Sequence, residues 1–420
     1  MNMRMMKTRT SWRISIDLKP LSFVLSLLVA ICAILGLTRI VSADQSFNPA
    51  DVVFEYEFGN LLNISATIPQ SENIKNLTIV IEPEDQQSRQ IQAIIQSDQK
   101  VDATYNLRTN ALDPFSRVYF WFEAELKDGS IITSPSYWFD YIDNRFEWKS
   151  NSTSLFEIYW VNGDAGYGQI LQQVARSGLE RATQLLPVVP EIPIKIYVYP
   201  DDSSLKSVLS LDSHTWVNGH TYLSANRILV TDTPPLDNVT DIERTIPHEL
   251  MHLLQFQIMG SNYGFAPLWL TEGLSSQTEL YPNTDYERVL TQAIGNGTLR
   301  PISDLCLGIS KDSSLALIDY AQSSSYVDFI QRNYGNQVFL KMLQDSATGM
   351  DCDKTVSSSL GITLEQLETN WTNAHSGENP YLSPSQISTI LWIAIPSLLL
   401  LAGVIMLILR RKKNCQDQEP

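Results

Sequence analysis

The stretch that decides the fold is "TIPHELMHLLQFQ", residues 245–257, which places His248 and His252 four residues apart with Glu249 directly after the first. On an α-helix, residues four apart lie on one face, one turn above each other. Both imidazoles can then reach one metal ion, and Glu249 stands where it can act on the water that such an ion activates. The alternative is an ordinary surface helix with two solvated histidines. Further residues elsewhere in the chain are needed to distinguish a metal site from such a helix.

A third candidate ligand follows further along the chain. Catalytic zinc needs three protein ligands and an open fourth position. Glu272 lies in "PLWLTEGLSSQTEL", residues 267–280, a stretch whose pattern predicts a helix. A single acid among Trp269, Leu270 and Gly273 is unusual for a solvated helix face and is typical of a ligand that reaches into a site.

The two motifs HELMH and WLTEG together resemble the gluzincin metallopeptidases, the lineage of thermolysin and the membrane aminopeptidases. More closely, they resemble the bacterial peptidase MA-like surface metallohydrolases, and the resemblance covers roughly residues 155–375. It implies one catalytic Zn²⁺ ion held by His248, His252 and Glu272, with Glu249 as the general base. It also implies that the strand "ANRILV" binds extended substrate by pairing along its edge. Asn226 and Arg227 are candidates to line the cleft, and a solvent-facing Arg227 is the alternative.

Members of this lineage usually add a tyrosine or histidine that donates a hydrogen bond to the developing oxyanion. Tyr320 and Tyr326, in "DYAQSSSYVDFI", are the candidates, because this stretch resembles the helix that follows the third ligand. Each of the two tyrosines could instead be a core aromatic residue.

Two departures from the family pattern leave alternatives open. The acid that usually braces a ligand histidine, four residues after the third ligand, is replaced by Ser276, so the brace is Glu279 or a backbone carbonyl. Pro247 directly precedes His248. Either a helix starts at a capping box of Thr240 and Glu243 and is kinked by the proline, or the helix starts near Pro247 itself.

Both ends of the chain are apolar. Residues 1–43 combine a basic start, an apolar run and the small residues Val41-Ser42-Ala43, which predicts a secretory signal; an uncleaved anchor is the alternative. Residues 387–409 carry no charge and are followed by four cations, which predicts a transmembrane helix with a cytoplasmic tail at 410–420. The expected localisation is a single-pass cell-membrane protein whose catalytic domain is extracytoplasmic.

Charge and cysteine usage agree with an exterior location. The formal net charge is −16, which argues against nucleic acid as a partner. Outside the two apolar ends the chain has only Cys306 and Cys352, so in an oxidising compartment we expect a disulfide between them; two buried thiols are the alternative.

These patterns predict an α+β fold with an N-terminal antiparallel β-sandwich, a gluzincin-like zinc metallopeptidase domain and a C-terminal transmembrane helix. Short β-branched and aromatic runs place an immunoglobulin- or fibronectin-like sandwich at 44–150. Helical spacing dominates the peptidase domain at 151–376, and 377–386 is a short linker.

The expected function is a membrane-anchored extracytoplasmic zinc metallopeptidase acting on peptides or proteins. Endopeptidase activity is favoured, because no motif that would grip a free substrate amine is found. The alternatives are a non-catalytic surface binding protein that uses the sandwich, with the zinc domain as a scaffold, and a metal-dependent hydrolase of a non-peptide amide.

Overall fold

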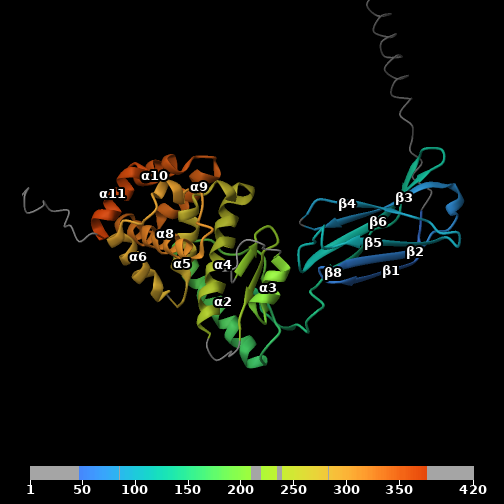
Figure 1. Ribbon diagram of the computed structural model, residues 1–420, viewed down its shortest axis with the longest axis horizontal. Coiled ribbons are helices and arrows are strands. Elements are labelled where there is room, and N and C mark those ends of the chain that lie inside the picture. The colour runs from blue at the N-terminus through green and yellow to red at the C-terminus, as the bar shows by residue number, and fades with distance from the viewer. Residues whose placement is uncertain (1–46, 85, 210–218, 234–238, 282, 376–420) are drawn as a thin grey trace, which may run out of the picture. The chain divides into compact units, whose positions relative to one another are not determined.

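The computed structural model describes residues 47–84, 86–209, 219–233, 239–281 and 283–375. This part of the chain is α+β and divides into two compact units (Figure 1). The first unit contains the described residues up to Asn110 together with Arg117–Asp140. The second contains Ala111–Ser116 and the described chain from Tyr141 onward.

The first unit consists of two antiparallel sheets. Its strands are β1 (Ala50–Glu57), β2 (Leu61–Thr67), β3 (Ile74–Pro83), β4 (Arg89–Ala93), β5 (Lys100–Asn106), β6 (Ser116–Leu126), β7 (Ile131–Thr133) and β8 (Tyr137–Tyr141), with a 3₁₀ turn at Ser71–Asn73. One sheet has the order β1-β2-β5 and the other β4-β3-β6-β7, with β8 also paired to β6.

The alternation of residue types explains why the two sheets face each other. In β5 every second residue is buried, and β6 buries Val118, Phe120, Phe122 and Ala124 on one face. Phe54 of β1 stacks on Phe139 of β8 with ring centroids 4.7 Å apart, which is a contact between the two sheets.

The second unit combines a mixed sheet with helices. Its elements are β9 (Lys149–Ser152), β10 (Phe156–Trp160), α2 (Ala165–Leu185), β11 (Ile194–Tyr199), α3 (Asp202–Leu209), β12 (Gly219–Tyr222), β13 (Arg227–Thr231), α4 (Thr240–Met259), a 3₁₀ segment η2 (Gly260–Phe265), α5 (Leu268–Thr278), α6 (Thr284–Asn296), α7 (Ile302–Leu305), α8 (Ser313–Tyr334), α9 (Gln337–Ala347), α10 (Cys352–Leu360) and α11 (Leu364–His375).

The sheet has the strand order β12-β13-β11-β10-β9, in which β10, β11 and β13 are parallel and the two outer strands are antiparallel to their neighbours. Every residue of β13 is buried, as expected for a parallel strand covered on both faces. Helix α2 connects β10 to β11 and packs beside α4 (Figure 1). A Cβ on Gly178 of α2 would lie 2.8 Å from Cγ of Pro247, so this glycine lets the two helices approach at the proline.

The fold-class prediction is wrong in ending on a transmembrane helix. Within the described ranges, no helix is both long enough and apolar enough to cross a membrane. The longest, α8, carries Asp319, Asp328 and Arg332 along its length and packs against α5 and α6. The segments for which a signal, linker, membrane span and tail were predicted, 1–43, 377–386, 387–409 and 410–420, lie outside the described residues.

Candidate metal centre

Helix α4 begins at Thr240 and runs through Pro247, so the helix does not start at the proline. Its N-cap is Val239, and Thr240 lies inside the helix rather than capping it. Because proline has no N–H, the carbonyl of Glu243 has no donor within the helix. The backbone N–H of Leu280 donates to that carbonyl at 2.8 Å, and the hydroxyl of Thr278 donates to the carbonyl of Pro247 at 2.9 Å.

The C-terminal end of α5, at Thr278, and the following Leu280 are therefore hydrogen-bonded to α4, the helix that carries the two histidines. This contact holds α5 beside α4 and brings Glu272 to the histidines. Nε2 of His248 lies 3.3 Å from Oε2 of Glu272, and Nε2 of His252 lies 3.7 Å from the same oxygen. One ligand atom from each of the three residues falls within 4.8 Å of the others, which is close enough for one metal ion.

The opposite ring nitrogen of His248 is held by Glu279, the residue directly after α5. Nδ1 of His248 lies 3.4 Å from Oε1 of Glu279. An ionised carboxylate can only accept, so Nδ1 carries a proton, and Nε2 is the nitrogen that would bind a metal ion in place of its own proton. Of the two braces left open by the sequence, the structure places the Glu279 carboxylate at His248.

Nδ1 of His252 is held by a neutral network that sequence reasoning missed. Nε2 of Gln255 donates to the carbonyl of Thr271 at 3.0 Å, so its amide oxygen is left to accept from the hydroxyl of Tyr263 at 3.3 Å. The Tyr263 oxygen then accepts from Nδ1 of His252 at 2.8 Å. The only sequence signal was Gln255, a polar residue on the buried face of α4.

The charges around the two ligand types are complementary. Although burial opposes protonation, hydrogen bonds to Glu272 and Glu279 raise the pKa of His248 to about 10. Burial likewise opposes ionisation of Glu272, but the charges of His252 and His248 hold the pKa of that carboxyl below its usual value. In the absence of a cation the cluster therefore holds a proton where a metal ion would otherwise sit.

Glu249 is buried and is positioned by β12. The hydroxyl of Thr221 donates to Oε2 of Glu249 at 2.5 Å. Two residues earlier on the same strand, a Cβ on Gly219 would lie 2.7 Å from Oε1 of Glu249 and 2.6 Å from Cγ2 of Thr245. Only glycine leaves room there for the carboxylate.

Strand β12 is the edge strand of the sheet as described, whereas the "ANRILV" strand, β13, lies between β12 and β11. The expectation that "ANRILV" would offer its edge to substrate is therefore wrong. Asn226 and Arg227 are buried and are not part of the cavity lining. The amide of Asn226 donates instead to the carbonyls of Ile192 and Pro193.

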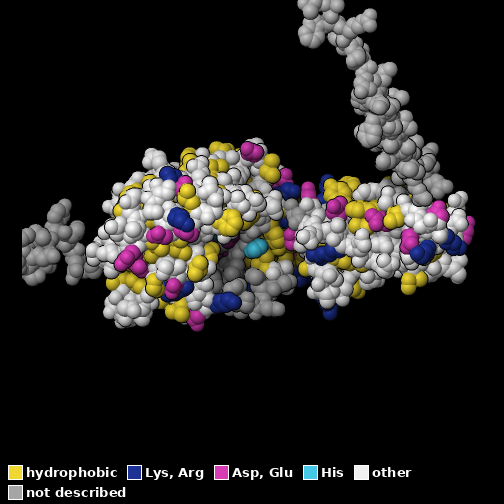
Figure 2. Space-filling model, turned by 90° about the horizontal axis from the view of Figure 1, so that it is seen from above, with side chains coloured by type: hydrophobic (Ala, Val, Ile, Leu, Met, Phe, Trp, Pro, Cys, Tyr) yellow, Lys and Arg dark blue, Asp and Glu magenta, His cyan; other side chains and the backbone are white. Residues whose placement is uncertain are grey.

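The cluster opens into a cavity of about 390 Å³. The lining comprises Gly219, His220, Thr221, Leu223, Arg244, Thr245, His248, Glu249, His252, Tyr263, Leu268, Glu272, Glu279, Tyr286 and Tyr320. In the space-filling view, a histidine side chain is visible within a hollow of the surface (Figure 2).

The structure separates the two candidate tyrosines. Tyr320 lines the cavity, and its ring centroid lies 6.2 Å from that of His248. A Cβ on Gly273 would lie 2.4 Å from the carbonyl of Ser323, so this glycine allows α8 to approach α5 closely and brings Tyr320 to the metal cluster. Tyr326 is fully buried against Trp371, with ring centroids 4.5 Å apart, and does not line the cavity.

The phenols of the cavity are kept protonated. Burial, with a further contribution from the charge of Glu272, raises the pKa of Tyr320 and of Tyr263 well above its usual value. Burial also lowers the pKa of His220, so that this imidazole is neutral at physiological pH. The tyrosine hydroxyls can therefore act as hydrogen-bond donors.

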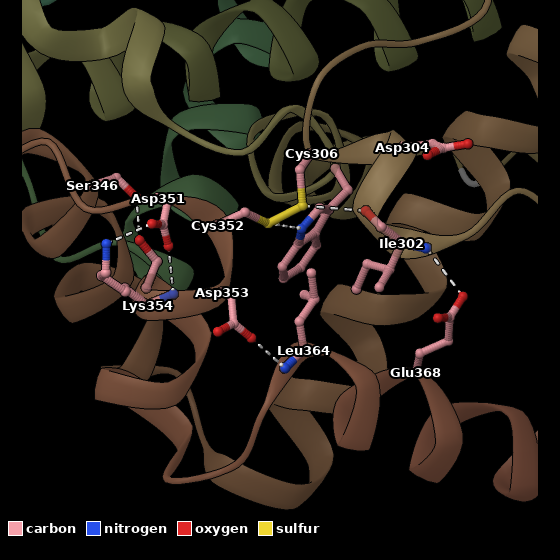
Figure 3. The surroundings of a disulfide bond; sticks show 12 residues. Ile302, Asp304, Cys306, Ser346, Asp351, Cys352, Asp353, Lys354, Leu364 and Glu368 are labelled. Carbon is pink, nitrogen blue, oxygen red and sulfur yellow. Dashed lines mark hydrogen bonds and ion pairs between the residues drawn. A yellow bond between two sulfur atoms is a disulfide. The ribbon is translucent and has the colours of Figure 1, made fainter.

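A disulfide joins Cys306, which follows α7, to Cys352 at the start of α10, with an S–S distance of 2.01 Å (Figure 3). The indole N–H of Trp269 donates to Sγ of Cys352 at 3.4 Å, and the backbone N–H of Leu268 donates to the carbonyl of Cys306 at 3.3 Å. Both contacts reach the first turn of α5, so the bridge supports the helix that carries Glu272.

Comparison with known proteins points to a peptidase. Residues 174–377 match the family model of the Peptidase MA superfamily, a match that begins within α2 and includes α4 and α5. It supports a gluzincin-like peptidase, a hydrolase of a superfamily whose members are typically metal-dependent. No curated protein sequence matches the chain.

The likeness to two solved structures is distant. An aminopeptidase N family protein from Idiomarina loihiensis is 10% identical over 82% of this chain and 75% of its own, with a TM-score of 0.35. A purple acid phosphatase from yellow lupin (Lupinus luteus) seeds is 12% identical over 44% and 35%, with a TM-score of 0.19. At such scores neither likeness bears on the fold or the activity.

Proposed function

We propose that the protein is a zinc-dependent peptidase that hydrolyses internal peptide bonds of peptides or proteins. The observation that carries the proposal is the convergence of Nε2 of His248, Nε2 of His252 and the Glu272 carboxylate, with the far nitrogen of each ring held by a hydrogen bond. Two imidazoles and one carboxylate form a donor set that suits catalytic zinc and leaves a coordination position open.

The fit of the residues to zinc rests on their hydrogen bonds. Each Nδ1 is occupied by a partner that accepts, which fixes the ring orientation and leaves Nε2 free as a ligand. When bound, zinc supplies Lewis-acid activation of water and of the substrate carbonyl.

Glu249 is the general base in this proposal. Its carboxylate lines the cavity beside the three ligands, and one of its oxygens is fixed by Thr221. It accepts a proton from the attacking water and passes that proton to the nitrogen of the departing amine. The hydrogen bond from Thr221 lowers the freedom of the side chain and keeps it directed at the cavity.

Tyr320 is the proposed donor to the oxyanion. It lines the cavity near His248 and its raised pKa keeps the hydroxyl protonated at neutral pH. A donor directed at developing negative charge in a site with little water stabilises the transition state.

Endopeptidase action is favoured by the distribution of carboxylates. An aminopeptidase needs an acidic group that grips the free amine of its substrate. Each of the three carboxylates among the described lining residues is already engaged, Glu249 by Thr221 and both Glu272 and Glu279 by histidines. We further propose that β12, as the edge strand, pairs with extended substrate.

We propose that this activity is exercised outside the cytoplasm. The Cys306–Cys352 disulfide supports this location, because such bonds persist in oxidising compartments and are rare in the cytosol.

The test uses purified full-length protein, zinc analysis and a library of quenched fluorescent peptides. The wild type is expected to bind one equivalent of zinc and to cleave peptides. Glu249→Gln is expected to keep its zinc and fold but to lose at least about 100-fold in kcat, because a neutral amide cannot accept the proton. His252→Ala should lose both zinc and activity.

Three results would contradict the proposal. Absence of zinc from the wild-type protein would contradict the proposed metal site. Equal peptide cleavage by the wild type and Glu249→Gln would show that Glu249 is not the general base. A zinc-loaded wild type that cleaves no peptide would favour a binding protein on a metal scaffold.

A further inference from the structure

We infer that Arg244 is the substrate-anchoring residue of the cavity and that it binds a carboxylate on the substrate, one or two residues from the bond that is cut. This inference rests on the proposed peptidase function and adds to it a class of substrate: peptides with an acidic side chain, or a terminal carboxylate, near the scissile bond.

Arg244 lies on the same helix as the metal cluster, one turn before His248. Residues four apart share a face of a helix, so Arg244 opens into the same cavity as the ligands. Thr245 and Glu279 also line this end of the cavity. The arginine is therefore part of the wall that a bound peptide would contact.

The guanidinium group is held in place without being neutralised. Its Nε donates to the carbonyl of Tyr281 at 3.2 Å, and its Cζ lies 5.2 Å from the centroid of the Tyr281 ring. These two contacts fix the orientation of the planar group. Among the described residues no carboxylate forms an ion pair with it, so both terminal nitrogens are available to a ligand.

Arg244 is also the sole Lys or Arg among the described lining residues. The carboxylates there are engaged elsewhere: Glu272 and Glu279 with the histidines, and Glu249 with Thr221. A fixed, half-buried guanidinium with two free nitrogens matches a carboxylate through two parallel hydrogen bonds. This geometry is more selective than that of a mobile surface cation.

The position of Arg244 along α4 determines which part of the substrate its guanidinium group reaches. Four residues of helix rise about 6 Å, whereas an extended peptide advances about 3.3 Å per residue. The anchored carboxylate therefore belongs to a residue about one or two positions from the reacting carbonyl, as a Glu or Asp side chain or as the end of a chain.

The experiment uses four versions of one cleavable peptide, with Glu or Gln near the scissile bond and with a free or amidated C-terminus. They are assayed with the wild type, Arg244→Gln and Arg332→Gln. Arg244→Gln keeps a donor for the Tyr281 carbonyl and removes the charge. Arg332, an exposed residue of α8 outside the cavity, is the matched control.

We expect the wild type and Arg332→Gln to prefer one carboxylate probe over its neutral isostere by about 10- to 100-fold in kcat/KM, the range for a charge-assisted bidentate contact. Arg244→Gln should reduce this ratio to near one, whatever its rate on the neutral probe. The Glu probe and the free C-terminus report separately which source supplies the carboxylate. Arg244→Lys should retain part of the preference.

Binding of the same probes to Glu249→Gln and to the double variant Glu249→Gln/Arg244→Gln, measured by calorimetry, gives a readout that does not need turnover. The inference is overturned if the wild type shows no carboxylate preference or if Arg244→Gln keeps it. A wild type that cleaves none of the probes would instead contradict the proposed function. The binding measurement would still decide whether Arg244 binds the carboxylate.

Discussion

The hydroxyl of Thr221 and the carboxylate of Glu249 are joined by a hydrogen bond of 2.5 Å between an edge strand and the metal helix. Gly219, two residues earlier, leaves the space that the carboxylate occupies. The orientation of Glu249 is thus set by β12 as well as by its own helix. This separates the positioning of the proposed base from the positioning of the metal ligands, and the two can be perturbed independently.

Replacement of Thr221 by valine should lower kcat by about 10-fold, because the isosteric side chain cannot donate to Glu249 and the carboxylate loses its fixed orientation. Zinc content and KM should stay unchanged. Thr221→Ser restores a hydroxyl and should recover most of the activity. Steady-state kinetics with zinc analysis check this, and a loss of zinc in Thr221→Val would contradict the assignment.

Replacement of Glu279 by glutamine should weaken metal binding by about 10- to 100-fold, the usual effect of removing an outer partner of a ligand histidine. The measurement is competition against a chelator at fixed pH. Glu287→Gln, an exposed residue of α6, is the control and should bind metal as the wild type does. Equal affinities for all three proteins would show that Glu279 does not brace His248.

Metal affinity should depend on pH through His248, whose pKa is raised to about 10 by Glu272 and Glu279 against the effect of burial. Below that pH the ring is protonated in the metal-free protein, and a metal ion must displace the proton. Apparent affinity should therefore rise about tenfold per pH unit from pH 7 to 9 and level off above 10. Chelator competition across this range checks the slope, and a flat profile would contradict it.

The same shift affects the stability of the metal-free protein. The folded pKa of His248 lies above the ordinary value of 6.5, so the stabilisation is fully present below pH 6.5 and is lost as the pH rises toward 10. The melting temperature of chelator-treated protein should be lower at pH 10 than at pH 7. The metal-loaded protein should not show this pH-dependent decrease, because the metal ion replaces the proton on His248.

Removal of the disulfide should destabilise the second unit. The bridge closes a loop with a sequence separation of 46, and such cross-links typically contribute about 2–4 kcal/mol to the free energy of unfolding. Urea unfolding of Cys306→Ala/Cys352→Ala should show this loss. The wild type in a reducing agent should behave like the variant, and an unchanged midpoint in both would contradict the prediction.

The metal helix was predictable from sequence because its signal is local: two histidines at helical spacing need only a helix to share a face. Glu272 was predicted from its motif, but its approach to the histidines depends on the contact between Leu280 and Glu243. This is a tertiary contact between residues 37 apart in the chain, which periodicity does not encode.

The supporting residues were mostly not predictable. Tyr263 lies in a 3₁₀ segment without a motif, and Thr221 lies on another element with no spacing that marks it as a neighbour of the site. The strand "ANRILV" was recognised as a strand but assigned to the edge of the sheet, because an alternating pattern does not show which neighbours a strand has. The predicted membrane helix depended on composition alone and has no counterpart among the described helices.

Pro247 also has a consequence for the order in which the protein folds. The interior backbone of a helix without proline forms its hydrogen bonds as soon as the helix forms. In α4, the carbonyl of Glu243 has no donor within the helix and accepts its hydrogen bond from the N–H of Leu280. The neighbouring Glu279 arrives at His248 in the same docking step. High-affinity metal uptake during refolding should therefore lag behind helix formation, which makes the ion a reporter of the moment when α5 joins α4.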